Sequence, residues 1–214
     1  MIEVVAFDLF GVLAANQPPA LKADLAAALG AEPADFWREY WRFRPGYDVA
    51  ALTDAQYWQS VAGALGSQAG PLAAGQLRRL CELDDASWSG VNEPVVEFAA
   101  ELAEAGLALG LLSNIPARLA EHLLASHRWL GLFRAAGFSC RLGLAKPDPR
   151  AFRWLIEQFG ADPARVLYVD DRPENVRAAA GSGLRAVHFT TAADLRAYWH
   201  DHGRPALTEH HRSS

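Results

Sequence analysis

The sequence predicts an α/β fold in which a parallel sheet is covered by helices on both faces and a helical segment follows the first strand. Short apolar runs recur along the chain, and most of them end at polar residues. Helical patterns lie between the last four of these runs, an alternation that is typical of a parallel sheet. A stretch of about 70 residues, 16–85, shows helical periodicity and no convincing strand, so we expect it to form a separate helical unit.

Five apolar runs are the predicted strands, because short runs that are apolar throughout suit strands buried on both faces. They lie at residues 2–7, 107–112, 136–139, 166–169 and 186–189. Polar residues that follow these runs are expected at one edge of the sheet, where ligands bind beyond the carboxyl ends of parallel strands. These residues are Asp8, Ser113, Asn114, Lys146, Asp170 and Asp171.

The predicted helices have apolar residues at every third or fourth position, and several are followed by glycine. In the core they lie at residues 94–105, 116–126, 149–159 and 173–180. In the helical segment they lie at 21–29, 33–43 and 72–83, and another helix begins at the capping box of Thr53 and Gln56. We therefore divide the chain into a core of residues 1–15 and 86–199, a cap of residues 16–85 and a polar tail of residues 200–214.

Composition and charge exclude several classes of protein. The 214-residue chain is 51% apolar with a net charge of −5, which excludes disordered and collagen-like chains and argues against nucleic-acid binding. The N-terminus has no basic region before its apolar run, and no run approaches the roughly 18 apolar residues of a membrane helix. We expect a cytoplasmic monomer or homodimer without a membrane partner, in which Cys81 and Cys140 are reduced thiols.

The acidic residues at the predicted sheet edge admit two interpretations. Asp8 could serve as a nucleophile or a metal ligand. The adjacent Asp170 and Asp171 repel each other, and a divalent cation such as Mg²⁺ would relieve that repulsion. Alternatively, Asp8 simply ends a strand and Asp171 caps the helix that follows it.

The other residues at this edge also have two interpretations each. Ser113 and Asn114 either cap a helix or receive a phosphate at its start. Lys146, one of only two lysines in the chain, is either an ordinary loop lysine or a cation that neutralises a bound anion. Taken together, the residues favour phosphoryl transfer to an aspartate, with a small phosphate ester or acyl phosphate as the anionic substrate.

Four segments carry a family resemblance: FDLFGVL at residues 7–13, LSN at 112–114, KPDP at 146–149 and YVDDRPEN at 168–175. They span most of the chain, and in this order they resemble the motifs of the haloacid dehalogenase-like hydrolase superfamily. The resemblance implies a Rossmann-like core with a mobile cap. A helical segment directly after the first motif resembles the C1 cap subclass of that superfamily.

The resemblance also implies roles for the matching residues. Asp8 would be the catalytic nucleophile, with Ser113 and Lys146 assisting catalysis. The ligands of Mg²⁺ would be Asp8, Asp171, Asp170 and the backbone carbonyl of Phe10. The substrate would contact Ser113, Asn114, Lys146, Phe10 and Asn175, the last of which would also brace the loop.

The sequence departs from the family pattern at Phe10, where phosphatases of the family place a second aspartate as general acid and base. Loss of such a group slows a reaction by about 10²- to 10⁴-fold. An aromatic residue here is similar to the haloacid dehalogenases of the family, but those have threonine in place of Val12 and serines in place of the acidic pair. The chain also resembles sugar-phosphate phosphatases of the superfamily, some of which lack the second aspartate. Three hypotheses therefore stand: a Mg²⁺-dependent phosphatase, a metal-independent dehalogenase and a non-catalytic binding protein.

Substrate specificity is expected to come from the cap. Arg44, Tyr47 and Asp48 lie in a stretch that the sequence predicts to be irregular, RPGYD, and they are the candidates for contacting the leaving group. Arg44 has an alternative interpretation as a solvated surface arginine. Without an acid at Phe10, we expect good leaving groups, such as those of acyl phosphates or anomeric sugar phosphates.

Overall fold

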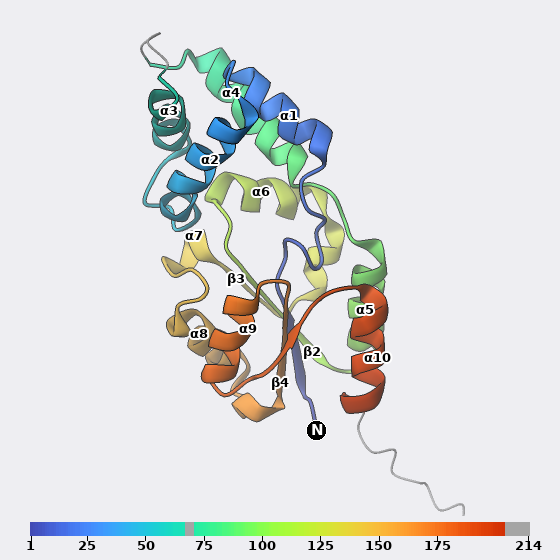
Figure 1. Cartoon of the computed structure of the whole chain (residues 1–214). Coiled ribbons are helices and arrows are strands. Elements are labelled where there is room, and N and C mark those ends of the chain that lie inside the picture. The colour runs from blue at the N-terminus through green and yellow to red at the C-terminus, as the bar shows by residue number, and fades with distance from the viewer. Residues whose placement is uncertain (67–70, 204–214) are drawn as a thin grey trace, which may run out of the picture.

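The computed structural model describes residues 1–66 and 71–203, and it contains the parallel sheet that the sequence predicts (Figure 1). Its strands are β1 (Val4–Phe7), β2 (Ala108–Ser113), β3 (Ala135–Phe138), β4 (Val166–Asp170) and β5 (Arg185–His188), in the spatial order β3-β2-β1-β4-β5. Phe7 of β1 pairs with Leu111 of β2 and with Val169 of β4. This register places the carboxyl ends of the three central strands at one edge of the sheet.

Helices cover both faces of the sheet because successive side chains of a strand point to opposite sides. Val5 and Phe7 face an apolar cluster that includes residues of α5, α6 and α10, whereas Val4 and Ala6 face one that includes residues of α8 and α9. The helical elements of the core are α5 (Glu93–Glu104), α6 (Ala117–Ser126), η1 (Arg128–Leu132), α7 (Ser139–Leu142), α8 (Pro149–Phe159), η2 (Pro163–Arg165), α9 (Pro173–Gly181) and α10 (Ala192–His202).

Four helices form an insert, residues 19–87, that lies beyond the carboxyl ends of the strands (Figure 1). They are α1 (Pro19–Ala28), α2 (Pro33–Asp48), α3 (Asp54–Ala64) and α4 (Ala74–Ser87). The insert has its own apolar core, in which Tyr40, Tyr57 and Trp58 are fully buried. Thr53 and Gln56 form the predicted capping box at the start of α3. A separate core explains why this stretch has helical periodicity of its own.

Helix α2 differs from the sequence prediction, which ended a helix at residue 43 and left the following residues irregular. The helix continues through Pro45 and Gly46 to Asp48. The sequence indicated a break because the residue before a proline disfavours helical geometry. In the folded chain Arg44 and Tyr47 are both buried on this last turn, and these contacts offset the local cost.

Two other boundaries differ from those the sequence predicts. Helix α4 crosses the predicted division between residues 85 and 86 and ends at Ser87. Helix α10 was not predicted; it buries Leu195 against the sheet and includes His200 and His202 of the predicted tail. Thr191 caps the start of this helix by accepting a hydrogen bond from the Asp194 N–H, and the helix packs against α5, which places Leu195 in the apolar core. Residues 204–214 of the tail lie outside the described residues.

Polar contacts join the insert to the core. Ser139 Oγ, at the start of α7, donates a hydrogen bond of 2.5 Å to the backbone carbonyl of Asp48. Arg118 of α6 pairs with Asp85 of α4 at 2.9 Å. These contacts hold the end of α2 over the edge of the sheet, so side chains of the insert can reach the predicted site.

Among the described helices, none is long and apolar enough to cross a membrane. Cys81 and Cys140 are free thiols, as the sequence led us to expect. The cytoplasmic location and the monomeric or dimeric state stay predictions.

Candidate active site

Three carboxylates meet at the carboxyl ends of β1 and β4. One oxygen each of Asp8, Asp170 and Asp171 lies within 4.8 Å of the other two. Burial raises the pKa of Asp8, and repulsion from Asp170 and Asp171 adds to this, against the attraction of Lys146. Burial and repulsion from Asp170 also raise the pKa of Asp171. A bound cation would relieve the repulsion among the carboxylates and favour their charged forms.

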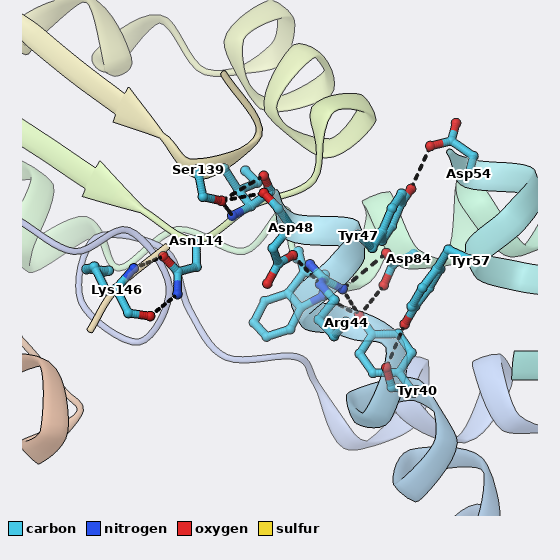
Figure 2. A network of polar contacts seen from close by, with 12 residues as sticks. Tyr40, Arg44, Tyr47, Asp48, Asp54, Tyr57, Asp84, Asn114, Ser139 and Lys146 are labelled. Atoms are coloured by element: carbon cyan, nitrogen blue, oxygen red, sulfur yellow. Dashed lines mark hydrogen bonds and ion pairs between the residues drawn. The ribbon is translucent and has the colours of Figure 1, made fainter. Parts of the chain in front are cut away.

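Lys146 is the protein cation that reaches this carboxylate cluster. Its Nζ lies 2.7 Å from Asp8 Oδ1 and 2.8 Å from Asp170 Oδ2, and its side chain is only 1% exposed. Asn114 fixes the lysine backbone, because its side-chain amide accepts from the Lys146 N–H and donates to the Lys146 carbonyl, both at 2.8 Å (Figure 2). The side chain of Asn114 thus positions Lys146, a role that the sequence did not indicate.

Asp170 differs from the other two carboxylates because its oxygens are already occupied. Besides Lys146, it accepts hydrogen bonds from the Tyr168 hydroxyl at 2.6 Å, the Arg172 backbone N–H at 2.9 Å and the Asn175 amide at 3.0 Å. Burial raises the pKa of Asp170, but Lys146 and these hydrogen bonds outweigh burial and hold the pKa below its ordinary value. Asp170 therefore fixes Lys146, while Asp8 and Asp171 keep oxygens free for a ligand.

Ser113 has a hydroxyl with no partner in the described part of the chain. Its Oγ lies at the end of β2, is buried, and makes no hydrogen bond there. A buried polar group left unpaired costs about 1–3 kcal/mol, so such groups are rare in native proteins. An anion bound at this edge of the sheet would supply the acceptor that the hydroxyl lacks.

A cavity of about 210 Å³ lies between the sheet edge and the insert. The ring of Phe10 packs against Trp88 with centroids 4.6 Å apart, and Trp41 lies 6.3 Å from Trp88. Both units contribute to the lining, which consists of Asp8, Phe10, Asn16, Trp41, Arg44, Asp48, Trp88, Asn114, Lys146, Asp171, Arg172 and Asn175. The cavity therefore brings together most of the site residues that the sequence predicts.

Of the three cap residues that the sequence nominates, Arg44 and Asp48 line the cavity and Tyr47 does not. Arg44 lines the cavity and is buried, not solvated. Tyr47 is not among the lining residues: its ring stacks on Tyr57 at 4.2 Å and its hydroxyl donates to Asp54 at 2.8 Å (Figure 2). Because α2 stays helical to its end, Tyr47 is directed into the core of the insert. This corrects the expectation that Tyr47 contacts the substrate.

Sequence reasoning missed several residues that shape the site. Tyr168 could have been found, because residues two apart on a strand share a face and Tyr168 lies two before Asp170. Arg172 directly follows the acidic pair and lines the cavity. No local signal identifies Trp41 or Trp88, which reach the cavity only through the contact between insert and core.

The donor set at this edge fits Mg²⁺. Mg²⁺ is usually bound through one or two carboxylates, waters and phosphate oxygens, and Asp8 and Asp171 offer such oxygens. Gly11 lies beside them with a φ of +81°, and a Cβ at this position would collide with the carboxylate of Asp171. Only glycine allows the loop after Asp8 to approach Asp171 this closely.

Comparison with known proteins agrees with this geometry. The chain is similar to phosphoglycolate phosphatase of Aliivibrio fischeri, with 27% identity over 220 residues that cover 95% of this chain and 88% of the relative. A wild-type haloacid dehalogenase family enzyme of Bacteroides thetaiotaomicron, solved with magnesium and inorganic phosphate, shares the fold. Its TM-score is 0.72 at 18% identity, covering 89% of this chain and 96% of that one.

A dehalogenase shares the fold as well. The L-2-haloacid dehalogenase of Xanthobacter autotrophicus, solved with chloropropionic acid covalently bound, has a TM-score of 0.67 at 19% identity. The superposed region covers 96% of this chain and 85% of the dehalogenase chain. The model of one family, described as haloacid dehalogenase-like hydrolase, matches residues 2–183. The chain therefore belongs to the haloacid dehalogenase-like hydrolases.

Proposed function

We propose that the protein is a Mg²⁺-dependent phosphatase that acts on a small phosphorylated metabolite through an aspartyl-phosphate on Asp8. The observation that carries the proposal is the cluster of Asp8, Asp170 and Asp171, of which Asp8 and Asp170 contact Lys146, together with the unpaired Ser113 hydroxyl at the end of the neighbouring strand β2. The insert would act as a C1-type cap over the site. The phosphatase relative in Aliivibrio fischeri supports the same reaction class.

Two displacements at phosphorus make up the reaction. A carboxylate oxygen of Asp8 forms a bond to phosphorus, and the bond from phosphorus to the leaving oxygen breaks, with the electron pair going to the leaving group. Water then attacks phosphorus of the acyl phosphate and loses a proton to solvent, which releases inorganic phosphate and restores the Asp8 carboxylate. The oxygen of the leaving group takes its proton from solvent. Ser113 would donate to a phosphoryl oxygen, and Lys146 would neutralise charge on the same group.

Mg²⁺, when bound, would supply further charge neutralisation at the transferring group. Its proposed ligands are carboxylate oxygens of Asp8 and Asp171 and the backbone carbonyl of Phe10. Asp170 would act through its hydrogen bonds to Lys146 and Asn175, since its own oxygens are occupied. Asn175 would brace the loop that carries the acidic pair.

Metal removal tests this proposal. We expect chelation to abolish phosphate release from a broad panel of phosphate esters and acyl phosphates, and added Mg²⁺ to restore it. Chloride release from 2-chloropropionate is measured in parallel, with and without chelator. Chelator-insensitive chloride release without turnover of any phosphate compound would favour the dehalogenase instead.

Phe10 decides which leaving groups are accepted, because no acid at this position protonates the departing oxygen. Phe10→Asp is expected to raise kcat by about 10-fold or more for esters with poor leaving groups, since general acid catalysis contributes about 10²- to 10⁴-fold. The measurement is kcat across phosphate esters of rising leaving-group pKa. Phe10→Asn is the control, because asparagine is similar in size to aspartate and has no ionisable group. Equal rates for the two variants would exclude this explanation.

The second candidate function is a metal-independent haloacid dehalogenase. It is favoured by Phe10 and Trp88, which place an apolar wall beside Asp8. The acidic cluster weighs against it, because dehalogenation at carbon needs no cation and the repulsion among the three carboxylates would then have no use. The non-catalytic hypothesis predicts binding of phosphate compounds without turnover in the same panel.

A further inference from the structure

The insert contributes the cavity wall that lies beyond Asp8, and the charges on this wall are paired. Arg44 Nε lies 2.7 Å from Asp48 Oδ1, and Arg44 NH1 lies 3.5 Å from Asp84 Oδ2 (Figure 2). Their side chains are 4%, 13% and 4% exposed. One guanidinium therefore faces two carboxylates in a largely dry environment. The wall has no net positive charge, even when one of the acids holds a proton.

Arg44 is also fixed in place by neighbouring hydrogen bonds. Its NH1 donates to the hydroxyl of Tyr40, which itself donates to Asp84 Oδ1 at 2.7 Å and accepts from Trp88 Nε1 at 3.1 Å. Turning the guanidinium toward a substrate would break these buried contacts and leave Asp84 without its cation, which is strongly unfavourable for a buried charge. Arg44 is thus committed to the protein and is not free to bind an anionic leaving group.

The other cations of the described cavity are paired as well. Lys146 contacts the buried Asp8 and Asp170. Arg172 Nε donates to Glu174 at 2.7 Å, and the Arg172 side chain is 62% exposed, so water screens its charge toward a bound substrate. The phosphoryl group would use Lys146 and the proposed metal ion. A carboxylate on the leaving group would instead lie near Asp48, with no uncompensated cation beside it.

The cavity groups that have no partner in the described part of the protein can bind substrate hydroxyls and an apolar carbon skeleton. Only Oδ1 of Asp48 accepts a hydrogen bond among the described residues, so Oδ2 can accept one from a substrate hydroxyl. Trp41 lines the cavity and is 48% exposed, while Trp88 and Phe10 complete an apolar surface. The cavity of about 210 Å³ adjoins one of about 660 Å³, and both are lined by Trp41 and Asp48, so these two side chains face the space that a leaving group would occupy.

We propose that the leaving group of the substrate is uncharged and carries hydroxyls, and that Asp48 binds these hydroxyls while repelling carboxylates. The inference rests on the proposed phosphatase function and narrows its substrate class. It predicts that substrates with a carboxylate on the leaving group bind poorly. Phosphoglycolate, the compound in the name of the Aliivibrio fischeri relative, is such a substrate.

The test compares glycerol 3-phosphate with 3-phosphoglycerate. The two differ only in that a hydroxymethyl group replaces a carboxylate. Each is measured as an inhibitor of Mg²⁺-dependent hydrolysis of p-nitrophenyl phosphate, which gives an inhibition constant whether or not the compound is turned over. Because like charges brought together in a site repel each other, we expect glycerol 3-phosphate to bind at least about 10-fold more tightly than 3-phosphoglycerate.

Asp48→Asn is expected to bring the two inhibition constants to within about 3-fold of each other. It removes one of the two negative charges, those of Asp48 and Asp84, that oppose a substrate carboxylate. The ratio is taken within one variant, so partial loss of folded protein does not affect it. Asp54→Asn is the matched control: it removes a carboxylate of the insert that contacts Tyr47 and does not line the cavity. We expect this control to keep the wild-type ratio.

The outcomes separate the inference from the proposed function. If p-nitrophenyl phosphate is not hydrolysed with Mg²⁺, the phosphatase proposal itself fails. If it is hydrolysed but 3-phosphoglycerate binds as tightly as glycerol 3-phosphate, the substrate class is wrong. If the wild-type preference holds and Asp48→Asn leaves it unchanged, the role of Asp48 is wrong.

Discussion

Replacing Asp8 with asparagine is expected to abolish phosphate release, lowering kcat by at least about 10⁴-fold for every substrate of the wild-type enzyme. The neutral amide lacks the nucleophilic oxygen that forms the bond to phosphorus, and it weakens the proposed metal site. The measurement is phosphate release at saturating Mg²⁺ with p-nitrophenyl phosphate and with an acyl phosphate, both of which have good leaving groups.

The stability of the Asp8→Asn variant separates loss of chemistry from loss of fold. Burial and the neighbouring acids raise the pKa of Asp8, so removing its charge relieves repulsion while Lys146 keeps Asp170 as a partner. We therefore expect the free energy of unfolding to change by no more than about 1 kcal/mol, the centre of the range for single substitutions. Turnover retained by this folded variant would contradict the nucleophilic role of Asp8.

Lys146→Met is expected to have the largest effect on stability. Removing one partner of a buried ion pair costs about 3–5 kcal/mol, and the Lys146 side chain is 1% exposed between Asp8 and Asp170. The variant should also lose phosphatase activity, since the transferring group loses a cation. Urea unfolding in the absence of Mg²⁺ measures the first effect and phosphate release the second.

Added Mg²⁺ and a charge-conserving variant test whether the lost stability comes from the missing positive charge. A bound divalent cation stabilises the folded state, so Mg²⁺ should recover part of the lost stability of Lys146→Met without restoring turnover. Lys146→Arg keeps the charge but needs more room and a different geometry, so we expect it to lie between wild type and Lys146→Met in stability. Equal stability of Lys146→Met and wild type without Mg²⁺ would show that Lys146 does not balance the acidic cluster.

The core of the fold was predictable because its signals are local. The five apolar runs became β1 to β5 within two residues at each end, and helix α8 has the predicted bounds of residues 149–159. Helix α10 was missed because its burial depends on packing against α5 and the sheet. The continuation of α2 through Pro45 was missed because tertiary contacts of Arg44 and Tyr47 overcame a local preference.

The site was predictable where it depends on strand ends and not where two units meet. Asp8, Ser113 and Asp170 follow from the register of neighbouring parallel strands, and Lys146 is brought to them by its loop. Trp88 and Trp41 reach the cavity across the contact between insert and core, which no pattern in the sequence encodes. Phe10 was recognised as a departure, but its contact with Trp88 required the structure.

The central claim is that Asp8 receives the phosphoryl group beside a Mg²⁺ ion. A crystal structure of the protein with Mg²⁺ and beryllofluoride, a mimic of the aspartyl-phosphate, tests it most directly. We expect the fluoroberyllate on a carboxylate oxygen of Asp8, the ion in contact with Asp8 and Asp171, and Lys146 and Ser113 in contact with the fluorides. A fully occupied ion with no fluoroberyllate on Asp8, in crystals of active protein, would contradict the claim.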